Sequence, residues 1–227
     1  MTTFLKKNLT CSICGNSSTF DVLTSTNCFG SPDLDLRPAE MERSTINMKI
    51  QRCPKCGYCS KDISKSKEGA KHIMNTNRYK AIFEDENYPE LARNYLCASI
   101  IDEDIGDVKV ATWMAMNAAW ACDDAETRGQ ASDCRLRALE LLQVMENKGV
   151  GIGSKAATYI LMADLMRRAG ISQHLDEIIE KAIKSQPNEV ELKVINYESE
   201  LISRGDTGVH RIVEAIEFKK SPWANYP

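Results

Sequence analysis

Two short cysteine motifs carry the clearest chemistry in this sequence. They read Cys11-Ser-Ile-Cys14-Gly15 and Cys53-Pro-Lys-Cys56-Gly57. A Cys-x-x-Cys turn places two thiols on one side of a tight loop, and the glycine after it permits the left-handed backbone that points amide groups at the sulfurs. Two such turns supply four sulfur ligands, the number that a tetrahedral zinc ion takes. The sequence therefore predicts a metal site at Cys11, Cys14, Cys53 and Cys56.

The identity of the metal is open between zinc and iron. The two turns also resemble those of rubredoxins, which hold iron in four thiolates, and both metals accept tetrahedral sulfur. Zinc is the better prediction, because nothing else in the sequence suggests electron transfer. Four protein ligands leave no open coordination position, so the predicted role of the zinc is structural.

The other five cysteines belong to no paired turn. Cys28 and Cys59 are interpreted as ordinary thiols, although either could substitute as a metal ligand. Cys97, Cys122 and Cys134 stand singly in helical patterns and are interpreted as small core residues.

Residues 1–64 are predicted to form a zinc-ribbon-like module with a long inserted loop. Residues 18–24 and 46–52 alternate in the manner of strands, and we expect them to pair as the arms that carry the cysteine turns. Between them, residues 30–38 form a turn-rich loop. Its Asp33, Asp35 and Arg37 could make a polar site, but a solvated loop with local hydrogen bonds is the expectation.

The rest of the chain is predicted to be helical. Residues 65–88 form linking helices, residues 89–220 a helical domain and residues 221–227 a tail. Apolar and small residues recur at helical spacing, and the clearest stripe is Ala111, Met114, Ala115, Ala118, Ala119 and Cys122. Further helices are predicted over residues 131–147, 154–170, 172–186, 190–204 and 209–219.

Residues 156–189 match the 34-residue tetratricopeptide pattern. Tyr159 and Ala163 occupy packing positions of the first helix, Ala182 lies where the second crosses it, and Pro187 ends the unit. A plain helical bundle is the alternative. The predicted fold is mainly α: a tetratricopeptide-like array of antiparallel helical hairpins with a small N-terminal β zinc-ribbon module.

Charge is divided unevenly along the chain. The formal net charge is +6 over residues 1–80 and −9 over residues 81–227. Residues 49–80 hold nine lysines and arginines but only Asp62 and Glu68 as acids. This basic stretch could bind nucleic acid. A solvated basic face, or one that docks onto the acidic helical half, is the favoured interpretation, because aromatic residues for base stacking are sparse there.

No arrangement typical of an active site is found. The three histidines, His72, His174 and His210, fall on different segments. The glycine-rich stretch 149–155 follows a helix and lacks the order of a phosphate-binding loop. We therefore expect a non-catalytic interaction protein whose helical groove binds a peptide or protein partner. The tail, with Trp223 and Tyr226, could occupy such a groove. The oligomeric state is left open.

The amino-terminal stretch contains no signal-peptide pattern, and no segment has about 18 uninterrupted apolar residues. An odd number of cysteines without a secretory signal argues against a disulfide framework. We expect a cytoplasmic protein with no membrane association.

The order CSICG, GSPDLDLRP, QRCPKCGYC and then tetratricopeptide-like helices resembles an uncharacterised bacterial family, domain of unknown function 2225. The resemblance extends over most of the chain. It implies zinc at Cys11, Cys14, Cys53 and Cys56, and it implies no activity.

Overall fold

The computed structural model of this chain describes residues 1–219. The tail, 221–227 with Trp223 and Tyr226, lies outside the described residues. The strands are β1 (Thr3–Thr10), β2 (Ser17–Ser25), β3 (Gln51–Arg52) and β4 (Cys59–Ser60), and a 3-10 helix, η1 (Arg43–Met48), precedes β3. The helices are α1 (Ala70–Ile73), α2 (Asn77–Glu84), α3 (Glu90–Asp104), α4 (Val108–Asp124), α5 (Arg128–Asn147), α6 (Lys155–Arg168), α7 (Leu175–Lys184), α8 (Glu189–Ser203) and α9 (Ile212–Glu217).

Two antiparallel hairpins make up the β part. β1 pairs with β2 in a long ribbon, and β3 pairs with β4 in a short one. Each hairpin carries one cysteine turn between its strands. The expected pairing of residues 18–24 with 46–52 is wrong, because the first segment pairs with β1 instead.

Residues 46–48 belong to η1, and strand structure begins only at Gln51. Ile46 and Ile50 are both buried. Residues four positions apart lie on the same face of a strand as well as of a helix, so this spacing does not distinguish the two. The Tyr95 hydroxyl donates a hydrogen bond to the Ile46 carbonyl at 2.7 Å. This contact from α3 favours the helical turn over a strand.

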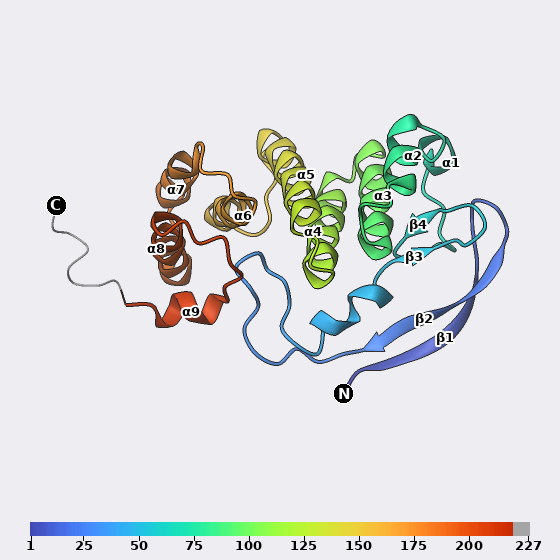
Figure 1. Ribbon diagram of the computed structural model, residues 1–227, viewed down its shortest axis with the longest axis horizontal. Helices are drawn as coiled ribbons and strands as arrows, with labels where there is room; N and C mark the ends of the chain where they lie inside the picture. Colours follow the sequence, from blue (N-terminus) through green and yellow to red (C-terminus); the bar gives the residue numbers. More distant parts are fainter. Residues whose placement is uncertain (220–227) are drawn as a thin grey trace.

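The helices follow one another in a row, from α1 to α8 (Figure 1). From α2 onward each helix packs on the next, and α1 packs on α3. Ala115, Ala118 and Ala119 on α4 are all at most 1% exposed. Small side chains let α4 approach both α3 and α5 closely. The mainly α fold with a small N-terminal β module is as predicted, whereas the tetratricopeptide character of the hairpins stays a prediction. No helix within residues 1–219 is long and apolar enough to cross a membrane.

The loop expected to be solvated is buried instead. Asp33, Asp35 and Arg37 are 2%, 1% and 6% exposed. This part of the chain runs along one side of the row of helices, between the β module and α9 (Figure 1). Asp33 pairs with the nearby Arg43. Asp35 and Arg37 tolerate burial because distant helices supply their partners, which local sequence does not reveal. We call residues 31–37 the inner segment.

Candidate metal centre

Four sulfur atoms meet where the two hairpin turns face each other. The Sγ atoms of Cys11 and Cys56 are 3.7 Å apart, and those of Cys14 and Cys53 are 3.6 Å apart. All four lie within 4.8 Å of one another. These separations far exceed the roughly 2 Å of a disulfide. They match the edge of about 3.8 Å expected for a tetrahedron with metal–sulfur bonds of about 2.3 Å. The four cysteines are close enough to hold a metal ion.

The two cysteine turns have the same backbone design. The amide of Gly15 donates to the Cys11 carbonyl, and the amide of Gly57 donates to the Cys53 carbonyl, both at 2.9 Å. The two glycines adopt φ angles of 71° and 76°. In this left-handed conformation a residue with a Cβ is strained. The glycine after each second cysteine therefore has the backbone role that the sequence predicted.

Helix α2 supports the second turn. The Tyr79 hydroxyl donates to the Gly57 carbonyl at 2.8 Å. The Phe83 ring lies directly against Gly57, and the guanidinium of Arg52 lies 4.5 Å from the centre of that ring. The predicted linking helix thus positions the Cys53–Cys56 half of the cluster.

The surroundings of the sulfurs favour a thiolate at Cys53, but they oppose four thiolates together unless a cation is present. Burial raises the pKa of Cys53, but the amides of Cys56 and Lys55 and the neighbouring sulfurs outweigh it and lower the pKa to about 7. Burial and the other three sulfurs raise the pKa of Cys56. Four thiols packed this closely cannot all ionise alone. A bound metal cation removes this conflict, so the donor set fits such an ion.

The remaining cysteines lie apart from this cluster. Cys28 is exposed, while Cys59 is fully buried and directs its thiol at the Gly57 carbonyl. Among the described residues neither joins the metal-binding group. Cys97, Cys122 and Cys134 are buried in the helical core, as predicted.

The two glycines offer a matched test of the turns. Alanine at Gly15 would meet no atom within 4 Å, whereas a Cβ at Gly57 would lie 2.7 Å from the Phe83 ring. We expect Gly15→Ala to cost about 1–2 kcal/mol from backbone strain alone. Gly57→Ala adds the clash and should cost clearly more. Metal retention against a chelator and thermal unfolding measure both effects, and equal losses would contradict the packing described for Phe83.

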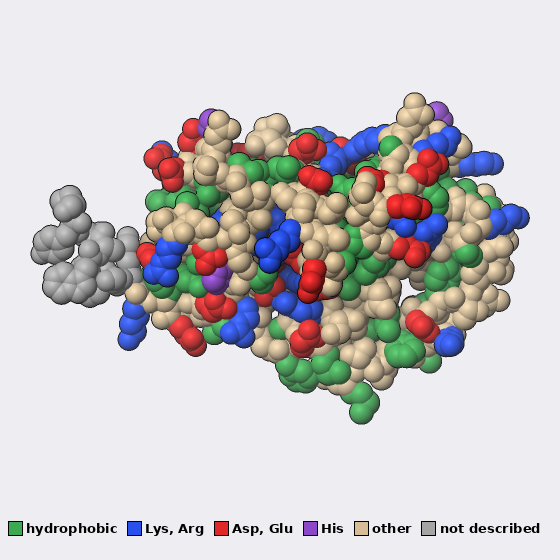
Figure 2. All heavy atoms as spheres, viewed as in Figure 1, with side chains coloured by type: hydrophobic (Ala, Val, Ile, Leu, Met, Phe, Trp, Pro, Cys, Tyr) green, Lys and Arg blue, Asp and Glu red, His purple; other side chains and the backbone are tan. Residues whose placement is uncertain are grey.

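Most of the basic stretch is paired with acids. Of its nine cations, five form ion pairs: Lys49 with Glu42, Arg52 with Glu90, Lys65 with Asp62, Lys67 with Asp102, and Arg78 with Glu103 and Asp104. Lys55, Lys61, Lys71 and Lys80 have no such partner within residues 1–219. Positive and negative side chains are intermixed over the face of the molecule that Figure 2 shows. Nucleic-acid binding by residues 49–80 stays a prediction. An affinity for nucleic acid that does not fall as the salt concentration rises would contradict it.

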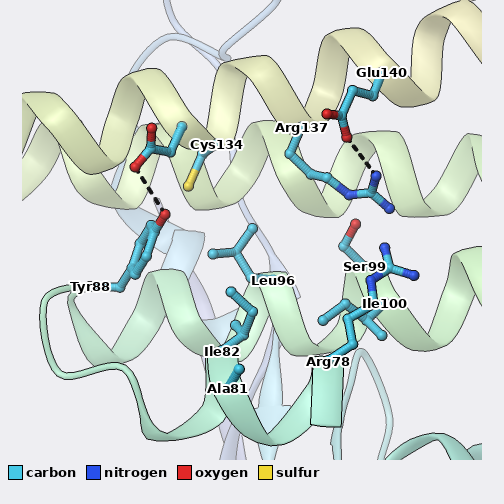
Figure 3. A pocket seen from close by; sticks show the side chains of 11 residues that line it. Arg78, Ala81, Ile82, Tyr88, Leu96, Ser99, Ile100, Cys134, Arg137 and Glu140 are labelled. Carbon is cyan, nitrogen blue, oxygen red and sulfur yellow. Dashed lines mark hydrogen bonds and ion pairs between the residues drawn. The ribbon is translucent and has the colours of Figure 1, made fainter. Parts of the chain in front are cut away.

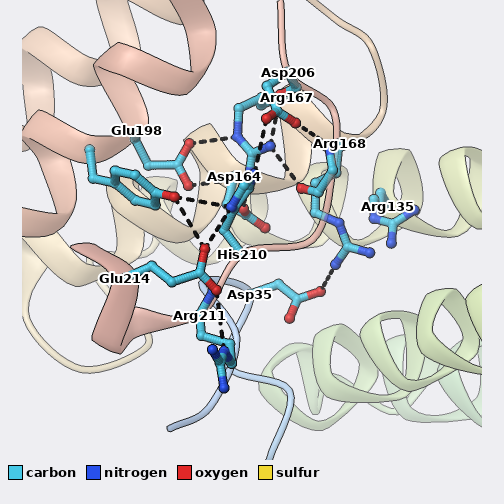
Figure 4. Close-up of polar contacts among 12 residues, drawn as sticks. Asp35, Arg135, Asp164, Arg167, Arg168, Glu198, Asp206, His210, Arg211 and Glu214 are labelled. Carbon is cyan, nitrogen blue, oxygen red and sulfur yellow. Dashed lines mark hydrogen bonds and ion pairs between the residues drawn. The ribbon is translucent and has the colours of Figure 1, made fainter. Parts of the chain in front are cut away.

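A buried polar network ties α6 to its neighbours (Figure 4). Arg167 donates to Glu198 at 2.8 Å, to Asp164, and to the carbonyls of Asp206 and Gly208 at 2.8 and 2.9 Å. The side chains of Arg167, Asp164 and Glu198 are at most 2% exposed. One guanidinium therefore holds two carboxyl groups from α6 and α8 together with the loop that leads to α9.

This network should make stability depend on pH. Burial, and then the charge of Asp164, raise the pKa of Glu198 well above its ordinary value of 4.5. Burial, and then the charge of Asp35, raise the pKa of Asp164. The folded chain keeps a proton that the unfolded chain releases. The contribution of this pair is therefore complete below about pH 4 and declines as the pH rises through the raised pKa.

Glu198→Gln keeps the shape and removes the titration. We expect its free energy of unfolding, relative to wild type, to improve as the pH rises above the ordinary carboxyl pKa of 4.5. Urea unfolding at a series of pH values measures this difference directly. Parallel curves for the two proteins would show that the pair does not hold the proton.

Sequence interpretation missed this network, although a signal was present. Asp164 stands on the same helical face as the buried Leu161, and Glu198 lies between the buried Val194 and Leu201. A charge within an apolar stripe is rarely buried without a partner. The sequence offers no means of pairing α6 with α8 through Arg167.

A cavity of about 390 Å³ lies between α2, α3 and α5 (Figure 3). Ile82, Leu96 and Ile100 form apolar parts of its wall. Two of its polar pairs lie within the wall, since Arg137 donates to Glu140 at 2.8 Å and Tyr88 donates to Asp133 at 3.2 Å. Arg78 pairs with Glu103 and Asp104 outside the wall, and the Cys134 thiol also lines the cavity.

Comparisons with known proteins give a single positive result. No curated protein and no solved structure matches the chain. A family model, described as an uncharacterised protein conserved in bacteria, matches residues 4–202, which is most of the chain. The chain therefore belongs to this bacterial family, domain of unknown function 2225.

Proposed function

We propose that this protein is a non-catalytic interaction module. In this proposal a structural zinc ion holds the N-terminal module together, and the row of helices binds an extended segment of a protein partner. The helical pairs α4–α5 and α6–α7 would act as tetratricopeptide-like units, which commonly bind extended or helical segments.

Zinc is preferred over iron for the four-sulfur cluster. The four cysteines of the cluster would fill all four positions of a tetrahedral ion and leave none for a substrate. This arrangement is typical of structural zinc. Thiolate ligands persist in reducing compartments, so the proposal also places the protein in the cytoplasm.

One observation carries the interaction proposal: the helices already bind a non-helical segment, which belongs to this chain. The inner segment contacts α4 and α6, pairs through its backbone with the residues before α9, and closes a tight turn from Asp33 to Arg37. A face that binds one such segment through main-chain and side-chain contacts has the chemistry to bind another.

Photo-crosslinking in cells tests the proposal. A crosslinking residue at Val190 on α8, which is 48% exposed and lies beside Leu34 and Leu36 of the inner segment, should capture a discrete partner protein. The matched control carries the same residue at Lys7, on the exposed ribbon β1. If Val190 yields no product beyond those of Lys7, the helical face has no partner and the proposal is wrong.

A further inference from the structure

The backbone of the inner segment pairs with the chain just before α9. The Leu34 amide donates to the His210 carbonyl at 2.8 Å, and the Ile212 amide donates to the Pro32 carbonyl at 2.9 Å. Asp33 and Arg211 form an antiparallel bridge between these hydrogen bonds. This single bridge joins the start of the inner segment to the chain before α9. Residues 33–37 then form a tight turn, because the Asp33 amide donates to the Arg37 carbonyl and the Leu36 amide donates to the Asp33 carbonyl, both at 2.9 Å.

Two charged side chains of the inner segment are bound by residues of α4 and α6. Asp35 accepts from the indole of Trp120 at 2.9 Å and pairs with Arg168. Arg37 donates to both carboxylate oxygens of Asp124 at 2.7 Å. Figure 4 shows Arg168 reaching from α6 to Asp35. The helices therefore recognise a carboxylate followed, two residues later, by a cation.

The inner segment fits this face imperfectly. Leu36 has a φ of 66°, a conformation unfavourable for leucine. The Nε atom of Arg37 is buried without a hydrogen-bond partner. A cavity of about 120 Å³ remains beside Leu34 and Leu36, lined by apolar residues of α6, α8 and α9. An occupant with a larger apolar side chain and a relaxed backbone would fit better.

We propose that the inner segment is a replaceable occupant, and that a partner's segment with the same turn and the same chemistry takes its place. The partner supplies a carboxylate for Trp120 and Arg168, a cation two residues later for Asp124, and an apolar side chain for the cavity. This inference rests on the proposed function. It adds the chemistry of the partner and its competition with the chain's own segment.

Competition from the tethered segment should weaken binding of a free copy by a measurable factor. A tethered segment has an effective concentration of about 1 mM. If a free copy binds the open face with a Kd of about 10 µM, the tethered segment weakens that binding about 100-fold in wild type. A substitution that weakens binding of the tethered segment should therefore raise the affinity of the chain for a free copy of that segment.

The probe is a fluorescent peptide copying residues 30–39, and the protein is the full chain. The variant Asp35→Ala/Arg37→Ala removes both charged anchors of the tethered segment. We expect this variant to bind the peptide about 100-fold more tightly than wild type. A peptide carrying Arg37→Asp should not bind it. Adding Asp124→Arg to the variant should restore binding of that altered peptide, a rescue that a merely structural role would not produce.

Hydrogen exchange on wild type covers the case in which the variant fails to fold. A replaceable segment requires the Leu34 amide to exchange by local opening, well before the core amides of α4. Exchange of Leu34 only with global unfolding would overturn the inference, as would a folded variant that does not bind the peptide. If crosslinking at Val190 captures a partner while the peptide fails, the proposed function stands and only this inference is lost.

Discussion

Cys53→Ser is expected to abolish metal binding and to unfold the N-terminal module. Three thiolates cannot complete the four-sulfur site, and binding energies of structural zinc reach about 10–16 kcal/mol in small zinc peptides. The β1–β2 ribbon of this module has little else to stabilise it, because almost every residue of β1 is exposed. An isolated two-stranded ribbon is marginally stable in water.

Elemental analysis and hydrogen exchange measure this result. We expect about one zinc per wild-type chain and almost none in Cys53→Ser, with protection lost across residues 3–25 and 53–57 and retained in α4 and α5. Cys28→Ser is the control, because Cys28 is exposed and outside the cluster. If the wild-type protein is coloured and contains iron, the bound metal is iron and not zinc. If the Cys53→Ser variant retains its metal, Cys53 is not a ligand.

Arg167→Met is expected to be the most destabilising single substitution in the helical part. It leaves Asp164 and Glu198 buried beside each other without their shared cation. Removing one partner of a buried ion pair costs about 3–5 kcal/mol. The carbonyls of Asp206 and Gly208 lose their donor as well. Urea unfolding near neutral pH measures the cost, and lower pH should reduce it because protonated carboxyl groups need no cation.

Arg204→Met provides the matched control. Arg204 pairs with Glu200 on α8, but its side chain is 65% exposed, and such pairs contribute about 0–1 kcal/mol. Adding Asp164→Asn and Glu198→Gln to Arg167→Met should recover part of the loss, since no unpaired charge then remains buried. If Arg167→Met and Arg204→Met destabilise equally, the buried network does not stabilise the fold.

The sequence by itself determined the features that depend on local spacing. The four cysteines of the metal centre follow from two Cys-x-x-Cys-Gly turns, because such a turn fixes the direction of its own sulfurs. The helices follow from apolar periodicity, as with the alanine stripe of α4. Neither inference required knowing which distant segments meet.

Only the tertiary structure decided the fate of the charged residues. Asp35 and Arg37 sit in a turn-rich stretch typical of solvated loops, yet Trp120, Asp124 and Arg168 bind them from helices that lie more than 80 residues further along the chain. Glu198 likewise depends on Arg167, on another helix. Burial of a charge is favourable only when its partner arrives from elsewhere in the fold, and local sequence does not carry that information.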